Sequence, residues 1–308
     1  MSSLSYSGAP ARPSSRIDLL CVVAAGLLWG TGGLTGALLG QVAELHPLAI
    51  ATYRLAGGGL SLLAVLACAG RLPRLPRRAL PRVLTVGALT AMYQACYFAA
   101  VALTDLAVAT LITLGAAQVL VIAAEVVMYR RRPSSASLIA IALAVLGLGL
   151  LVGVPGVPGV AGVAGGGLIA GALLAVASAS GFAALTLLGR RPVAGLDASA
   201  TIGYGFASGA VLLALVTWPT VGLDFAPTVA SVGLLLYLGW VPTALAYALF
   251  FTGLLRGVTA SSAAVVAVLE PLTATVLSVL VLHARLGVPE LAGGGLLCAA
   301  VLVAGVRR

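Results

Sequence analysis

The chain has 308 residues, of which 61% are hydrophobic and only 8% are charged, and its mean hydropathy is +1.16. Soluble domains usually carry about 25% charged residues, so this chain has too little polar surface to coat a water-soluble particle of its size. The net charge is +9, but the arginines that carry it are spread over separate loops rather than gathered on one polar element. These properties exclude an ordinary soluble domain, argue against a nucleic-acid partner, and predict a protein embedded in a lipid bilayer.

Ten apolar segments follow one another along the chain, each close to the roughly 20 residues that a membrane helix needs. The predicted helices span residues 17–39, 47–69, 83–103, 107–129, 136–154, 167–189, 198–218, 229–254, 259–282 and 288–306. The predicted fold class is therefore all-α, a membrane protein with ten transmembrane helices. A serine-rich, disordered cytoplasmic tail is expected at residues 1–16, and a Gly/Pro/Val-rich linker at residues 155–166 divides the helices into two groups of five.

The second group of five helices repeats the first at an offset of about 154 residues, so that Tyr93 aligns with Tyr247. The match rests on hydropathy and on the spacing of turns. A copy that follows an odd number of membrane crossings is inverted relative to the first copy. The sequence therefore predicts two inverted five-helix repeats, residues 17–154 and 167–306, with a small-molecule substrate site where the two halves meet.

Arginine placement predicts the orientation of the helices in the membrane. The chain contains no lysine, and 15 of its 17 basic residues fall in the tail, in alternate loops or at the C-terminus. Of the other two, Arg285 lies on the opposite side and Arg54 lies inside a predicted helix. The positive-inside rule then predicts a multi-pass protein of the inner (cytoplasmic) membrane with both termini in the cytoplasm.

Ionisable residues inside apolar helices are the first candidates for function, because each costs about 2.5–3.5 kcal/mol on insertion scales. Glu270 lies about 16 Å into its predicted helix, near the bilayer midplane. Pro271 follows it and removes a backbone donor, which predicts a broken or kinked helix beside the carboxylate. Glu270 is a candidate for substrate binding and proton coupling, and Arg54 for an anionic substrate group; helix packing is the alternative for both. Glu125 is better explained by an interfacial ion pair.

Aromatic and amide side chains form a second group of candidates for substrate binding. Tyr93 and Tyr97 share one face of their helix, and Trp240 and Tyr247 are seven residues apart on the corresponding helix of the second half. The complete set of candidate substrate-binding residues is Trp29, Arg54, Tyr93, Gln94, Tyr97, Gln118, Trp240, Tyr247 and Glu270. The alternative for the aromatic residues is packing or contact with lipid.

Three sequence segments resemble the drug/metabolite transporter superfamily, in particular its EamA-type ten-helix carriers. They are LLWGTGGLTGALL from residue 27, HPLAIATYRLAGGGLSLL from residue 46, and TASSAAVVAVLEPLTATVLSVLVLHARLG from residue 259. The chain departs from the family pattern at Ala117, where the family often has proline, and at Arg130 and Ala284, where it often has glutamate. The resemblance implies a secondary transporter that exports a small metabolite or drug by alternating access.

The sequence shows no nucleotide-binding loop, no nucleophile–base arrangement and no cluster of metal ligands, so we expect no cofactor, no metal and no enzymatic activity. Its four cysteines lie in apolar segments and form no CxxC pair. Two alternatives stay open: an intramembrane lipid-linked transferase, which usually needs clustered acidic residues, and a passive channel. The chain is expected to work as a monomer or a homodimer.

Overall fold

The computed structural model describes residues 16–104, 106–130, 133–152, 165–193, 195–282 and 288–305, and these residues form helices without a β-strand. In chain order the elements are α1 (Arg16–Val42), α2 (Pro47–Cys68), the 3₁₀ helix η1 (Arg77–Ala79), α3 (Leu80–Leu103), α4 (Leu106–Tyr129), α5 (Ser135–Val152), α6 (Gly165–Gly189), α7 (Ala198–Val221), α8 (Val229–Gly239), the π-helix η2 (Trp240–Leu245), α9 (Ala246–Leu255), α10 (Ala260–Val266), α11 (Leu269–Leu282) and α12 (Val288–Gly305). The predicted tail and linker lie outside the described residues, except that Arg16 begins α1 and residues 165–166 begin α6.

Within the described residues, eight helical stretches are long and apolar enough to cross a membrane. They include Val229–Leu255, which combines α8, η2 and α9, and Ala260–Leu277, which combines α10 with part of α11. Two shorter apolar helices, Ser135–Leu150 and Leu291–Val303, lie where the fifth and tenth spans are predicted. The structure thus confirms an all-helical membrane architecture, while the number of ten transmembrane helices stays a prediction.

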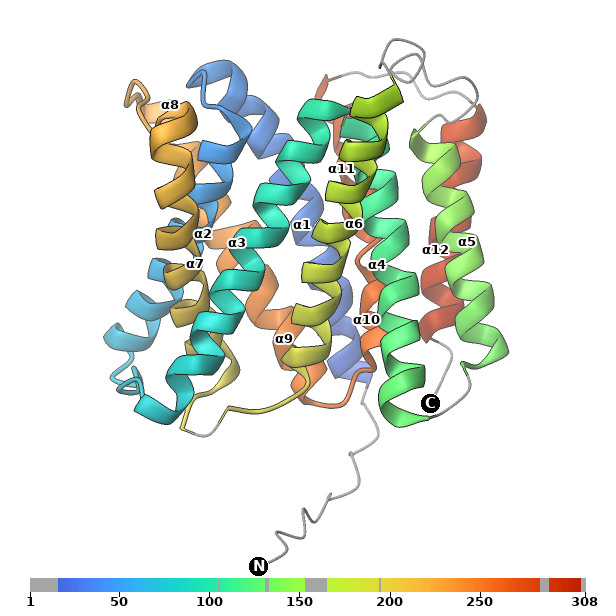
Figure 1. The fold of residues 1–308 in the computed structure, drawn as a ribbon, viewed down its shortest axis with the longest axis horizontal. Helices are drawn as coiled ribbons and strands as arrows, with labels where there is room; N and C mark the ends of the chain where they lie inside the picture. Colours follow the sequence, from blue (N-terminus) through green and yellow to red (C-terminus); the bar gives the residue numbers. More distant parts are fainter. Residues whose placement is uncertain are drawn as a thin grey trace, which may run out of the picture.

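Contacts between the first and second halves of the chain come in matched pairs (Figure 1). α3 packs against α6 as α1 packs against α9, and α4 packs against α6 as α1 packs against α11. These pairs are expected if the two halves are equivalent. In that case α1 corresponds to α6, α3 corresponds to α8–α9, and α4 corresponds to α10–α11. In the same way α2 packs against its counterpart α7, and α5 against α12. This packing is consistent with the two-repeat layout.

Glycines in α1 allow it to approach α11 closely. A Cβ atom added to Gly30 would lie only 2.4 Å from Thr273 Cβ and 2.6 Å from the Glu270 carbonyl oxygen. A Cβ atom on Gly26 would lie 2.9 Å from the Val266 carbonyl oxygen at the end of α10 and 3.1 Å from Leu269 Cβ at the start of α11. Such close approach of two backbones is the usual role of small residues between membrane helices. Because α11 carries Glu270, these glycines fix the position of that carboxylate's backbone relative to α1.

Two helices of the second half are interrupted, and a proline explains each interruption. In η2, Pro242 has no N–H group to donate to the Leu238 carbonyl, and Thr243 Oγ1 donates to that oxygen instead at 2.7 Å. Between α10 and α11, Pro271 provides no N–H group for the Ala267 carbonyl, which accepts from Glu270 N at 3.1 Å. The interruption at residues 267–268 therefore lies one helical turn before Pro271.

Candidate functional site

A hydrogen bond between two tyrosines joins the two halves of the chain. The hydroxyl oxygens of Tyr93 in α3 and Tyr247 in α9 lie 2.6 Å apart, although the residues are separated by 154 positions in sequence. Gln94 Nε2 donates to the Tyr93 hydroxyl at 3.1 Å. The spacing between the tyrosines equals the predicted repeat offset, so residues at equivalent positions of the two halves touch. An axis that exchanges the two halves would pass through this hydrogen bond.

Trp29 of α1 anchors an aromatic cluster beside the tyrosine pair. Its ring centroid lies 4.9 Å from the centroids of both Tyr247 and Phe250, and 6.2 Å from that of Phe182 in α6. The Trp29 side chain is only 2% exposed. Phe182 also contacts the Tyr93 ring at 6.2 Å. Helices from both halves therefore enclose this cluster with aromatic side chains, which combine a large apolar surface with polar groups that can bind a ligand.

Arg54 of α2 lies partly buried next to this cluster, and Thr243 orients it. Arg54 Nε donates to Thr243 Oγ1 at 3.1 Å, and the same hydroxyl donates to the Leu238 carbonyl left without an N–H partner by Pro242. The π-helix therefore supplies the hydroxyl that holds the guanidinium. Sequence reasoning missed Thr243; the Pro-Thr pair within an otherwise apolar helix is the signal that would have indicated it.

The charge of Arg54 acts on the other polar groups of the site. Its guanidinium interacts electrostatically with the hydroxyls of Tyr93, Tyr97 and Tyr247 and with the carboxylate of Glu270. Glu270 is partly buried in the first turn of α11, directly after the interruption of that helix. The described residues contain no Arg54–Glu270 ion pair within 4 Å. A positive and a negative group thus face the same region from α2 and α11 without neutralising each other directly.

Two of the predicted residues, one in the aromatic cluster and one on α4, have buried polar atoms without a hydrogen-bond partner among the described residues. They are the indole Nε1 of Trp29 and both amide atoms of Gln118, and each side chain is 2% exposed. Buried polar groups nearly always have partners in folded proteins. An indole N–H is a donor, whereas an amide is both donor and acceptor, so these groups are suited to bind a polar ligand.

The predicted residues differ in how they lie relative to this cluster. Tyr97 also interacts electrostatically with Arg54 and Glu270, and its hydroxyl lies 2.7 Å from Thr110 Oγ1 of α4. Trp240 is 47% exposed and makes none of the ring contacts found among the described aromatic side chains. In a regular α-helix, Trp240 would lie on the same face as Tyr247, which follows seven residues later. The i→i+5 hydrogen bonding of η2 rotates Trp240 away from that face.

Other charged groups serve the ends of helices. Glu125 of α4 forms an ion pair with Arg190 at 3.3 Å, which confirms an ion pair as the role of this carboxylate. Asp18 of α1 forms a second ion pair with Arg256 at 3.6 Å. Within the described part of the chain, no three His, Cys, Asp or Glu side chains are grouped as metal ligands. Glu270 and Arg54, which the structure also describes, differ from these residues because they do not form an ion pair with each other.

The architecture and the site together define a class of protein. Apolar helices long enough to cross a bilayer surround a buried centre with aromatic rings, a guanidinium and a carboxylate, as in proteins that move polar solutes across membranes. The comparison with known families agrees. The chain belongs to the EamA-like transporter family, whose model matches residues 16–153 and again residues 169–306. It is a membrane transporter.

Individual proteins resemble the chain over nearly its whole length. It is 31% identical over 284 residues to the uncharacterized transporter YwfM of Bacillus subtilis (strain 168), and the match covers 92% of each protein. A solved structure described only as a crystal structure of a protein matches with a TM-score of 0.79 and 22% identity. That match covers 93% of this chain and 96% of the other, and at this identity it supports the fold alone.

Proposed function

We propose that this transporter is a secondary active exporter of a small metabolite or drug and that it works by alternating access. The observation that carries the proposal is the hydrogen bond between Tyr93 and Tyr247, which are equivalent residues of the two halves. Substrate sites of transporters built from repeats lie where the repeats meet, near the bilayer midplane. Rocking of residues 17–154 against residues 167–306 would open and close the contact at this pair.

The substrate binds, in this proposal, among the side chains gathered around Arg54. The guanidinium binds an anionic or strongly polar group, and the rings of Trp29 and Tyr247 cover the apolar part of the substrate. Trp29 Nε1 and the Gln118 amide are polar groups that need partners, and they give the site its preference among substrates. A screen of small metabolites against the purified protein finds the substrate, because a ligand raises the melting temperature by mass action.

Glu270 couples transport to protons. Burying a charged carboxylate at membrane depth costs free energy, which proton uptake relieves, whereas a guanidinium close to it favours the charged form. Proton uptake by Glu270 would leave the Arg54 charge unbalanced and change which conformation is stable. The arginine-rich ends of the helices support an orientation in the inner (cytoplasmic) membrane with both termini in the cytoplasm.

The test compares Glu270→Gln with Glu125→Gln in proteoliposomes loaded with the substrate found in the screen. Glu270→Gln is expected to abolish flux driven by a pH gradient while substrate exchange without a gradient continues. Glu125→Gln removes a carboxylate that pairs with Arg190 near the end of α4 and is expected to leave pH-driven flux intact. Unchanged pH-driven flux in Glu270→Gln would disprove the proton role.

A further inference from the structure

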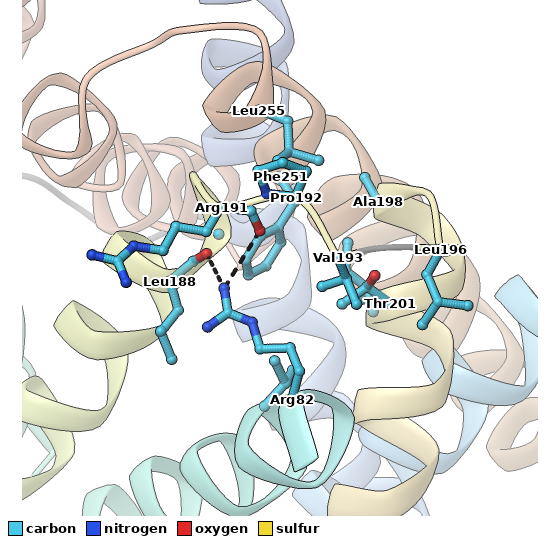
Figure 2. Close-up of a pocket in the computed structure, with 13 residues that line it drawn as sticks. Arg82, Leu188, Arg191, Pro192, Val193, Leu196, Ala198, Thr201, Phe251 and Leu255 are labelled. Atoms are coloured by element: carbon cyan, nitrogen blue, oxygen red, sulfur yellow. Dashed lines mark hydrogen bonds between the residues drawn. The ribbon is translucent and has the colours of Figure 1, made fainter. Parts of the chain in front are cut away.

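A second site lies at the ends of four helices (Figure 2). It borders the tyrosine pair, because the ring of its Phe251 lies 6.3 Å from that of Tyr247. A pocket opens between α3, the end of α6 with the loop that follows it, the start of α7, and α9. We call it the Arg82 pocket. One wall is apolar and includes Val86, Ile202, Phe251 and Leu255. Arg82, Arg191 and Thr201 also line it. Val86, Ile202 and Phe251 are buried and Leu255 is half-buried, so the pocket combines cationic side chains with an apolar floor.

Arg82 has hydrogen-bonding capacity left over for a ligand. Its Nη2 atom donates to the carbonyl oxygens of Leu188, at the end of α6, and of Arg191, the latter at 3.5 Å. A guanidinium carries five N–H groups in a planar fork. Among the described residues, Nε and Nη1 of Arg82 make no hydrogen bond. The fixed guanidinium therefore presents donors that match the oxygen atoms of a phosphate group.

No acidic side chain in the described part of the chain neutralises this pocket. Glu125 pairs with Arg190, Asp18 pairs with Arg256, and Asp197 accepts a hydrogen bond from Ala200 N at 2.7 Å as the N-cap of α7. Neither Arg82 nor Arg191 takes part in an ion pair there. The Arg191 side chain is exposed and points away from the Arg82 guanidinium in Figure 2, so it has room to turn toward a bound anion.

We propose that the Arg82 pocket binds a phosphate group carried on an apolar tail. The Arg82 fork and the Arg191 guanidinium hold the phosphate oxygens, and the tail lies against Phe251 and Leu255. A phospholipid headgroup and a soluble phosphate ester both offer this chemistry. The pocket lies at the arginine-rich ends of the helices, where basic pockets of membrane proteins meet anionic headgroups.

The test titrates the full-length protein, purified in neutral detergent, with phosphatidylglycerol and follows the apparent melting temperature by tryptophan fluorescence. Phosphatidylglycerol is expected to raise the melting temperature in a saturable way. Phosphatidylcholine is not, because its phosphate is already balanced by the quaternary ammonium of its own headgroup. Arg191→Gln and Arg82→Lys are each expected to weaken the apparent affinity about tenfold, the cost of a lost charge-assisted hydrogen bond. Arg71→Gln removes an equal charge from an exposed loop position outside the pocket and keeps the wild-type affinity.

A second titration with hexyl phosphate, a water-soluble phosphate ester with a short apolar tail, separates the two sources of phosphate. A stabilisation equal to that by phosphatidylglycerol assigns the pocket to soluble phosphate esters, and stabilisation by the lipid alone assigns it to the headgroup. Equal affinities of wild type and Arg191→Gln for both probes would overturn the proposal, as would the absence of any stabilisation. Because Arg82 also holds the end of α6, Arg191→Gln decides the outcome if Arg82→Lys folds poorly.

Discussion

The two halves of this transporter differ most in the helices that face the candidate site. In the first half, α3 (Leu80–Leu103) and α4 (Leu106–Tyr129) are continuous helices. In the second half, their counterparts are interrupted, by η2 between α8 and α9 and by the break between α10 and α11. Each interruption brings a polar group to the site: Thr243, which holds Arg54, and Glu270. The comparison shows that two halves with the same helix packing can differ in their polar groups, because a proline in a helix of the second half frees backbone groups that stay bonded in the first half.

The largest expected effect comes from introducing the second-half break into the first half. Ala117 of α4 is 2% exposed and occupies the position equivalent to Pro271 at the 154-residue offset. Ala117→Pro removes an N–H group from the middle of a helix and crowds the Thr113 carbonyl, and it is expected to lower the free energy of unfolding by about 3 kcal/mol or more. Thermal unfolding of the purified protein measures the loss.

Ala117→Gly is the matched control, since it retains the backbone N–H and costs about 1 kcal/mol. Equal stability of Ala117→Pro and wild type would mean that α4 accommodates a proline as readily as α10–α11 does. The absence of a break in α4 would then have a cause other than its lack of a proline equivalent to Pro271.

Hydropathy and charge sufficed to predict part of this arrangement. Arg54 and Glu270 are conspicuous because a charge inside an apolar helix is rare, whatever surrounds it. The role of Thr243 was not predictable in the same way, since threonine is common in helices and this hydroxyl matters only because Arg54 of another helix meets it. The same holds for Trp240, whose direction depends on η2. Sequence periodicity assumes a regular helix. It therefore cannot predict the direction of a side chain within or beside an irregular segment such as η2.

The second expected effect concerns that irregular segment. Thr243→Val keeps the side-chain shape but removes the hydroxyl, which leaves the Leu238 carbonyl without this donor and Arg54 Nε without this acceptor. Loss of a buried partner costs about 1–3 kcal/mol, and weaker substrate binding is expected as well because Arg54 loses its orientation. Thr85→Val in α3 is the control, since Thr85 is exposed and bonds only to the Pro81 carbonyl of its own helix. A stability loss as small in Thr243→Val as in Thr85→Val would mean that η2 does not depend on the hydroxyl.

The smallest expected effect probes the tyrosine pair, where the two halves are most alike. The Tyr93 hydroxyl has two partners, Tyr247 and Gln94, whereas the Tyr247 hydroxyl bonds, among the described residues, to Tyr93. Tyr93→Phe therefore leaves two buried groups unsatisfied, and Tyr247→Phe leaves Tyr93 bonded to Gln94. We expect Tyr93→Phe to destabilise the protein more, by about 1–2 kcal/mol, and Tyr247→Phe by about 1 kcal/mol or less.

A double-mutant cycle with both substitutions measures the coupling between the two hydroxyls directly. The double variant is expected to lose less stability than the sum of the single variants, because the bond between Tyr93 and Tyr247 is counted in each. Equal losses in the two single variants would mean that Gln94 adds nothing and that the pair is energetically symmetric. Strict additivity would mean that the bond joining the two halves contributes no stability, and that other contacts, such as those of Trp29 with Tyr247 and Phe250, hold the halves together at this point.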